Sequence, residues 1–285
     1  MLIDTHCHLH DRQFFTAKQA ETMLERARAN GVEKIICIGT DPTDSLAARD
    51  FATTHDGVYW TYGVHPSEWQ RWFGRDFLDN KKNFLKNVFV ASQCEHSKVR
   101  GAALGEANKK IPDENSSVQK ILFKPPCAIG EVGLDYHYGR DDRDQQIKLF
   151  EQMLQLATDH NLPVSFHIRE AFDDFFPIIA NFPNLKGVVH SFTDSKKNLR
   201  RILDQTDFYI GVNGLATYST LPTPPLSRTL LETDAPFLTP SQFRGIINEP
   251  GYVKCVATWL AGKLDTTYEI IEQETTNNAK RLFRI

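Results

Sequence analysis

The chain has 285 residues, of which 41% are hydrophobic and 24% are charged, and its formal net charge is −3. These values fit a globular protein with a large core, and they exclude a chain that binds nucleic acid through overall positive charge. Any attraction for a polyanion must therefore be local, for example from bound metal ions. We expect no membrane association, because no apolar run is long enough to span a bilayer and no signal-peptide pattern opens the chain.

The five cysteines are scattered along the chain, and their number is odd: Cys7, Cys37, Cys94, Cys127 and Cys255. No C-x-x-C pair occurs among them. This usage argues against a disulfide framework and predicts a cytoplasmic location.

Short apolar segments alternate with amphipathic ones along most of the chain. The apolar segments predict eight strands, at residues 2–4, 34–39, 58–64, 127–133, 163–168, 187–191, 208–212 and 229–233. Helical patterns lie between most of them, including residues 16–30, 43–55, 142–160 and 195–204, and further helices are expected from residue 249 onward. Apolar strands that alternate with helices indicate a parallel sheet covered on both faces. Eight such units predict an α/β protein with a (β/α)8 TIM barrel, formed as one domain over residues 1–285.

One connection, after the third predicted strand, is much longer than the others. Residues 72–126 hold ten Lys+Arg and six Asp+Glu, so this insertion carries about +4 and the rest of the chain about −7. A connection of this length is either a surface elaboration or a functional loop. The second interpretation makes it a basic lid that helps to hold a polyanion near the site.

Two histidines close the first predicted strand. Because side chains alternate along a strand, His6 and His8 share one face, and two imidazoles on one face can hold one metal ion. The pair alone is as compatible with chance as with metal binding.

Further ionisable residues lie at the ends of other predicted strands. Glu131 is at the end of the fourth strand, His167 of the fifth, His190 of the sixth and Asp234 of the eighth. The C-terminal ends of barrel strands meet at one rim, where catalytic residues lie. An ionisable group at the end of a buried strand is costly unless it is paired or bound to metal. Together these residues predict a metal site.

The sequence resembles the TatD family of metal-dependent deoxyribonucleases, within the amidohydrolase-like barrels. Matching segments run in order along nearly the whole chain: residues 4–9 (DTHCHL), 63–66 (GVHP), 130–136 (GEVGLDY), His167 with Arg169, and residues 190–193 (HSFT), 232–236 (ETDAP), 248–250 (NEP) and 278–283 (NAKRLF). The resemblance implies a distorted barrel, one or two metal ions, and hydrolysis of nucleic-acid phosphodiesters by metal-activated water.

By position in this resemblance, His6, His8 and Asp234 would bind one ion, while His167 and His190 would bind a second. Glu131 would bridge the two, and an anion between two cations offsets their repulsion. Asp234 could also accept a proton from the attacking water. The four histidines favour zinc, manganese or iron, whereas the family resemblance implies magnesium.

Two more strand-end residues have candidate catalytic roles. The planar guanidinium of Arg169 suits bidentate contact with phosphate, with a structural ion pair as the alternative. His65 could hydrogen-bond the phosphate or protonate the leaving group, or it could simply shape the loop before Pro66. Tyr136 could line a nucleotide pocket, although packing is the commoner role of such a ring. We interpret Glu232 as structural.

The leading hypothesis is a 3'-5' exonuclease that acts as a monomer on single-stranded DNA; the preference for ends comes from the resemblance. One alternative keeps the metal site but changes the bond, as in a metal-dependent esterase or amidase such as a D-aminoacyl-tRNA deacylase. Another is a non-catalytic module that docks a partner through the insertion.

Overall fold

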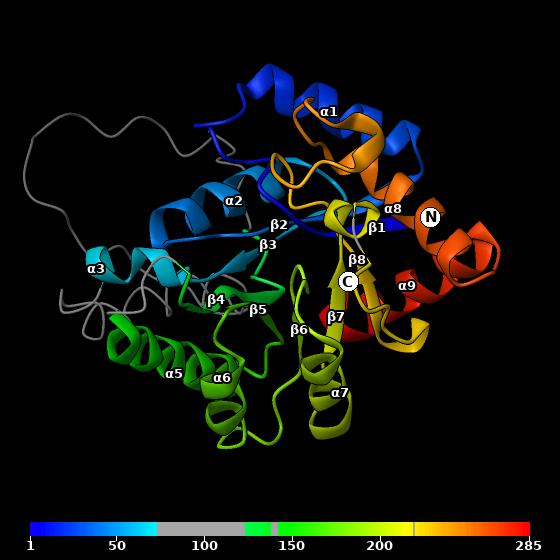
Figure 1. The fold of residues 1–285 in the computed structure, drawn as a ribbon. Coiled ribbons are helices and arrows are strands. Elements are labelled where there is room, and N and C mark those ends of the chain that lie inside the picture. The colour runs from blue at the N-terminus through cyan, green and yellow to red at the C-terminus, as the bar shows by residue number, and fades with distance from the viewer. Residues whose placement is uncertain (73–122, 138–141, 219) are drawn as a thin grey trace, which may run out of the picture.

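Eight parallel strands form the centre of the molecule (Figure 1). The computed structural model describes residues 1–72, 123–137, 142–218 and 220–285. The strands pair in chain order, and they are β1 Leu2–Cys7, β2 Val32–Cys37, β3 Val58–Tyr62, β4 Ala128–Asp135, β5 Val164–Arg169, β6 Gly187–Val189, β7 Tyr209–Val212 and β8 Thr229–Leu231. Beyond the last strand, Cys7 forms a parallel bridge with Ala235, and the Asp234 amide donates to the His6 carbonyl at 2.8 Å. These contacts bring the two ends of the sheet together, so the predicted (β/α)8 barrel is confirmed.

The helices surround the strands (Figure 1), and some of them begin at side-chain caps. The α-helices described are α1 Ala17–Ala29, α2 Pro42–Thr54, α3 Trp69–Trp72, α5 Arg143–His160, α6 Phe172–Ile179, α7 Lys196–Gln205, α8 Val253–Lys263 and α9 Tyr268–Phe283. Thr16 and Gln19 form a reciprocal capping box at the start of α1, and the Asp41 carboxylate accepts from two amides at the start of α2. Such side chains satisfy amides that have no partner inside the helix.

The barrel interior and the layer under the helices form two separate apolar clusters. The interior cluster takes alternate residues of the strands, including Ile3, Ile36 and Leu230, as the two-residue period of a strand requires. Leu282 and Phe283 of α9 belong to the same cluster. The C-terminal helix therefore packs at the N-terminal end of the barrel, and the opposite end remains available for a site.

Most of the predicted insertion, residues 73–122, lies outside the described residues. At its C-terminal end, Lys124 Nζ donates to three carbonyls, those of Ala52, His55 and Val58, and the Lys124 carbonyl accepts from Trp60 Nε1 at 2.8 Å. These bonds fix the point where the chain returns to β4.

Within the described residues, none of the helices is both long and apolar enough to cross a membrane. Cys7, Cys37, Cys127 and Cys255 are free thiols, and Cys94 lies outside the described part of the chain.

Candidate metal centre

A large open cleft lies at the C-terminal ends of the strands. Its volume is about 1500 Å³, including the solvent at its mouth. Among the residues that line it are His8, His65, Glu131, His167, Arg169, His190 and Asp234. His6 is buried beside them, so the structure brings all six predicted metal ligands together.

Glu131 lies at the centre of this cluster. One carboxylate oxygen, Oε2, is 3.4 Å from His6 Nε2, and the other, Oε1, is 2.7 Å from His167 Nδ1 and 3.9 Å from His190 Nε2. β4 continues four residues past Glu131, to Asp135, so Glu131 lies inside the strand rather than at the end predicted from sequence. The pairing of β4 with β5 shifts register between Ile129 and Val132, at the place where Glu131 enters the cleft.

Asp234 occupies the other side of the cluster. Its Oδ1 atom lies 3.5 Å from His6 Nε2, 3.4 Å from His8 Nε2 and 3.8 Å from His190 Nε2. The backbone at Asp234 is left-handed, with φ of 59°, a conformation that aspartate adopts more readily than most residues. One carboxylate thus faces three imidazoles.

Partners outside the cluster hold three of the histidine rings. His8 Nδ1 lies 3.1 Å from the Ile38 carbonyl, and His167 Nε2 lies 3.0 Å from Asp135 Oδ2. His190 Nδ1 lies 3.0 Å from Glu232 Oε1, and this oxygen accepts a hydrogen bond from the Ser191 amide. Such outer contacts fix the tautomer and the orientation of a metal-ligating histidine.

Sequence reasoning did not single out Asp135, and it read Glu232 only as structural. Glu232 does have a structural role, because it holds a histidine of the cluster. The alternation of Glu131, Gly133 and Asp135 on one face of β4 is the signal from which Asp135 could have been found.

His65 and Arg169 lie at the edge of the cluster. His65 Nε2 is 4.0 Å from Glu131 Oε1, and His65 Nδ1 accepts a hydrogen bond from the Ser67 amide at 3.1 Å. Arg169 is exposed on the cleft wall contributed by β5, and it is the only lysine or arginine among the described residues that line the cleft.

Tyr136 is absent from the described cleft lining, and its hydroxyl donates to Asp174 Oδ2 at 2.7 Å. Its ring packs against the core, as the alternative interpretation predicted.

Burial and charge together set the protonation of the cluster. Burial raises the pKa of Glu131, but His6 and the hydrogen bond from His167 outweigh it, so the pKa lies well below the usual value. Burial likewise opposes the ionisation of Asp234, and His190 and His8 lower its pKa overall. Burial is the main reason that the pKa of His65 falls to about 4. The two central carboxylates are therefore held ionised, the form that binds cations.

The donor atoms fit a divalent cation. His6 Nε2 is fully buried and has no hydrogen-bond partner, which is costly for a polar atom unless something else satisfies it. It lies 3.4 and 3.5 Å from its two carboxylate neighbours. Donor atoms that share one ion in tetrahedral geometry, each about 2.1 Å from it, lie about 3.4 Å apart. Three sets of residues each offer closely grouped ligand atoms: His6, His8 and Glu131; His65, Glu131 and His167; and His6, His190 and Glu232. Glu131 belongs to two of these sets.

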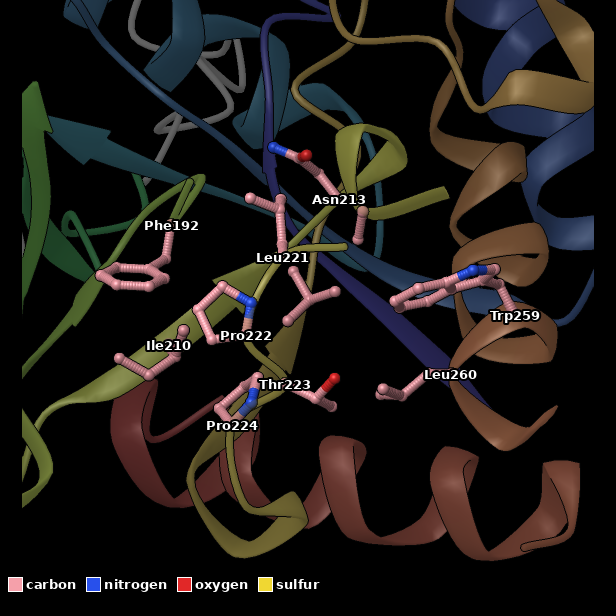
Figure 2. Close-up of a pocket in the computed structure, with 11 residues that line it drawn as sticks. Phe192, Ile210, Asn213, Leu221, Pro222, Thr223, Pro224, Trp259 and Leu260 are labelled. Atoms are coloured by element: carbon pink, nitrogen blue, oxygen red, sulfur yellow. The ribbon is translucent and has the colours of Figure 1, made fainter. Parts of the chain in front are cut away.

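Figure 2 shows a second, smaller cavity between β7, the loop that follows it and α8. Its lining consists of Phe192, Ile210, Val212, Asn213, Ala216, Leu221, Pro222, Thr223, Pro224, Trp259 and Leu260. The lining is mainly apolar and includes no histidine, cysteine or acidic residue. Asn213 connects this region to the metal centre, because its amide donates to Ser191 Oγ at 2.9 Å and to Glu232 Oε1 at 3.3 Å.

A parallel eight-stranded barrel with buried histidines and carboxylates at the C-terminal ends of its strands is the fold and the site expected of a metal-dependent hydrolase. Within that class the chain belongs to the TatD family, because residues 3–284 match the family described as TatD related DNase.

Individual relatives agree with this assignment. The chain is 34% identical to "Uncharacterized metal-dependent hydrolase YabD" of Bacillus subtilis (strain 168), with 100% of both chains covered. It is 30% identical to "3'-5' ssDNA/RNA exonuclease TatD" of Pantoea sp. (strain At-9b), again over 100% of both. Among solved structures, the TatD homologue YjjV of Escherichia coli K12 superposes with a TM-score of 0.77 at 26% identity, covering 100% of this chain and 98% of that one.

Proposed function

We propose that this metal-dependent hydrolase is a nuclease that removes nucleotides from single-stranded DNA in the 3'-5' direction. The observation that carries the proposal is the cluster around Glu131, which gathers buried histidines and carboxylates that could hold metal ions beside an open cleft. The relative from Pantoea, which bears the name of a 3'-5' ssDNA/RNA exonuclease, supports this choice of substrate. A monomeric state and a cytoplasmic location stay predictions.

In this proposal the cluster would hold two divalent ions. His6, His8 and Asp234 would hold one, His167 and His190 would hold the other, and Glu131 would be a ligand to both. Magnesium is implied by the family, and the nitrogen-rich ligand set also suits zinc or manganese. Ions held here would neutralise charge on the phosphodiester and make a water molecule easier to deprotonate.

Three residues that line the cleft have roles beyond metal binding. Asp234 is the general base, because its ionised carboxylate lies on the cleft wall and can accept a proton from the attacking water. Arg169 contacts the phosphate, since its guanidinium pairs well with two phosphate oxygens. His65 accepts from the Ser67 amide through Nδ1, so the neutral ring carries its proton on Nε2 and donates a hydrogen bond into the cleft.

The test is hydrolysis of a 5'-labelled single-stranded DNA by the purified chain with Mg²⁺, Mn²⁺ or Zn²⁺, and with EDTA. We expect a ladder of shortened products that EDTA abolishes. Removing a residue that only contacts a metal ligand typically lowers metal affinity or activity by about 10- to 100-fold. His6→Ala and Asp234→Ala remove predicted ligands themselves, so each should lower the rate by more than about 100-fold. His55→Ala, at the end of α2 and remote from the rim, is the matched control.

Two outcomes would contradict the proposal. Intact DNA with every metal would do so, as would equal activity of wild type and both ligand variants. A parallel assay on D-aminoacyl-tRNA decides whether the same centre instead cleaves a carboxylic ester, which would favour the deacylase alternative.

A further inference from the structure

Large apolar side chains are exposed mainly on loops that follow the C-terminal ends of three strands. Among the described residues, six large hydrophobic side chains are strongly exposed, and five of them lie on the loops after β1, β7 and β8: Phe14, Tyr218, Phe237, Ile246 and Ile247. Single exposed apolar residues are ordinary, but their gathering beside a site marks a surface that contacts a ligand or partner.

Two of these five residues line the cleft itself. The ring centroids of Phe14 and Phe237 are 5.1 Å apart at an interplanar angle of 82°, an edge-to-face pair. The rings are 45% and 44% exposed, so the contact between them leaves about half of each open to solvent. Core packing therefore does not account for their position.

The backbone ties this aromatic pair to the metal centre. The Phe237 amide donates to the Asp234 carbonyl at 2.8 Å, and the Phe237 carbonyl accepts from the Asn248 side chain. The Phe237 ring centroid is 6.2 Å from that of His8, a predicted metal ligand. The open rings are thus held at a fixed place next to the point where the phosphate would bind.

We infer that Phe14 and Phe237 form a stacking site for the nucleobase next to the scissile phosphate. The inference rests on the proposed function and adds to it the part of the substrate that this side of the cleft recognises. A base is joined to its phosphate through one sugar, so a phosphate at the metal centre brings the base to the neighbouring wall. Aromatic rings stack on any base, so the site would bind different sequences similarly. Arg169 lies on the β5 wall, so phosphate contact and base stacking come from different strands.

The first experiment compares two substrates. One is a single-stranded DNA, and the other is the same strand with abasic residues on both sides of its last phosphodiester. The variant Phe14→Ala/Phe237→Ala should lower kcat/KM on DNA by roughly 10-fold and change that on the abasic strand by less than about twofold. Phe237→Trp should retain activity on DNA. Ile270→Ala, which removes an exposed apolar side chain on α9 and outside the described cleft lining, is the matched control.

The second experiment measures binding without hydrolysis. The DNA carries 2-aminopurine, whose fluorescence is quenched by stacking, beside a phosphorothioate linkage that resists cleavage. Wild type should quench the probe, and the double alanine variant should not. Equal loss of activity on both substrates, or quenching that persists in the double variant, would overturn the stacking site.

The two experiments separate this inference from the proposed function. If wild type cleaves neither strand but quenches 2-aminopurine through the two rings, the nuclease proposal fails and the stacking site stands. Cleavage of both strands at equal rates by wild type, without quenching, keeps the nuclease and removes the stacking site.

Discussion

His8, His167 and His190 each have an acceptor on the side of the ring that faces away from the centre of the cluster. A backbone carbonyl or an ionised carboxylate can only accept, so the ring nitrogen that faces it carries the hydrogen. For His167 this places a proton on Nε2, facing Asp135, and leaves Nδ1 facing Glu131. Burial lowers the pKa of His167, but hydrogen bonds to Asp135 and Glu131 raise it to about 9 overall. Nδ1 is therefore the atom that gives up its proton when a cation binds.

Removal of the Asp135 carboxylate should weaken metal binding although Asp135 itself is not a predicted ligand. We expect Asp135→Ala to lower the affinity for Mn²⁺ or Zn²⁺ by about 10- to 100-fold, because the His167 ring loses its orientation, and Asp135→Asn to have a smaller effect. Isothermal titration measures the affinity directly. Asp159→Ala, which removes an exposed carboxylate on α5, should bind like wild type. Unchanged affinity in Asp135→Ala would show that His167 does not depend on this contact.

The six candidate ligands could be predicted from the sequence, but the groups that hold their side chains in place could not. His6, His8 and Asp234 could be selected because an ionisable group beside a buried strand contradicts the local apolar pattern. The contact between Glu232 and His190 depends on how closely two strand ends approach, and the Ile38 carbonyl leaves no mark in the sequence at all. The aromatic pair also escaped prediction, since Phe14 and Phe237 are 223 positions apart and meet only when the barrel closes.

At the scale of elements, the order of strands was predictable and several of their ends were not. β6 and β8 stop two residues earlier than predicted, whereas β4 runs two residues further. Apolar runs indicate where a strand is buried, but the end of a ladder depends on the partner strand. α6, Phe172–Ile179, was not among the predicted helices. Its buried residues Phe172, Phe175, Phe176 and Ile179 do follow a helical period, but the segment has only eight residues and Pro177 interrupts it, so the local pattern was too short to indicate a helix.

Close strand contacts around the cleft require glycine at particular positions. Gly133 pairs with His167 across β4 and β5, and a Cβ atom there would lie 1.9 Å from the His167 carbonyl oxygen. Its φ of +156° is also unfavourable for other residues. Gly133 thus permits the approach that brings His167 to Glu131.

Gly133→Ala should therefore damage both the fold and the metal centre. We expect a loss of about 1–3 kcal/mol in the free energy of unfolding, the usual effect of an overpacked site, together with weaker metal binding. The matched control is Gly262→Ala on α8, where an added Cβ meets nothing within 4 Å and alanine is the better helix former. Denaturant unfolding and metal titration of both variants provide the measurement. Equal stability of the two would contradict the role of Gly133.

At the scale of the whole molecule, the candidate metal centre joins parts of the chain that are far apart. Its residues come from β1, β4 and β5 and from the segments that follow β1, β6 and β8, so the first and last strands contribute to one cluster. Beyond the strands, the His8 amide donates to the Ala235 carbonyl at 2.8 Å, and the Thr5 hydroxyl donates to the Leu231 carbonyl at 3.0 Å. An ion bound by His6, His8 and Asp234 would add a further connection at this closure.

Metal binding should therefore stabilise the entire barrel. The unfolded chain does not hold these ligands in place, so the ion binds the native state preferentially, and an ion at 100 times its Kd contributes about 2.7 kcal/mol. For a chain of this size we expect Tm to rise by roughly 5 °C. Differential scanning calorimetry with EDTA or with added Mn²⁺ measures the shift, which should be absent in His6→Ala and retained in His55→Ala. The same rise in His6→Ala would place the stabilising ion elsewhere, because this variant lacks the buried Nε2 atom that has no other partner.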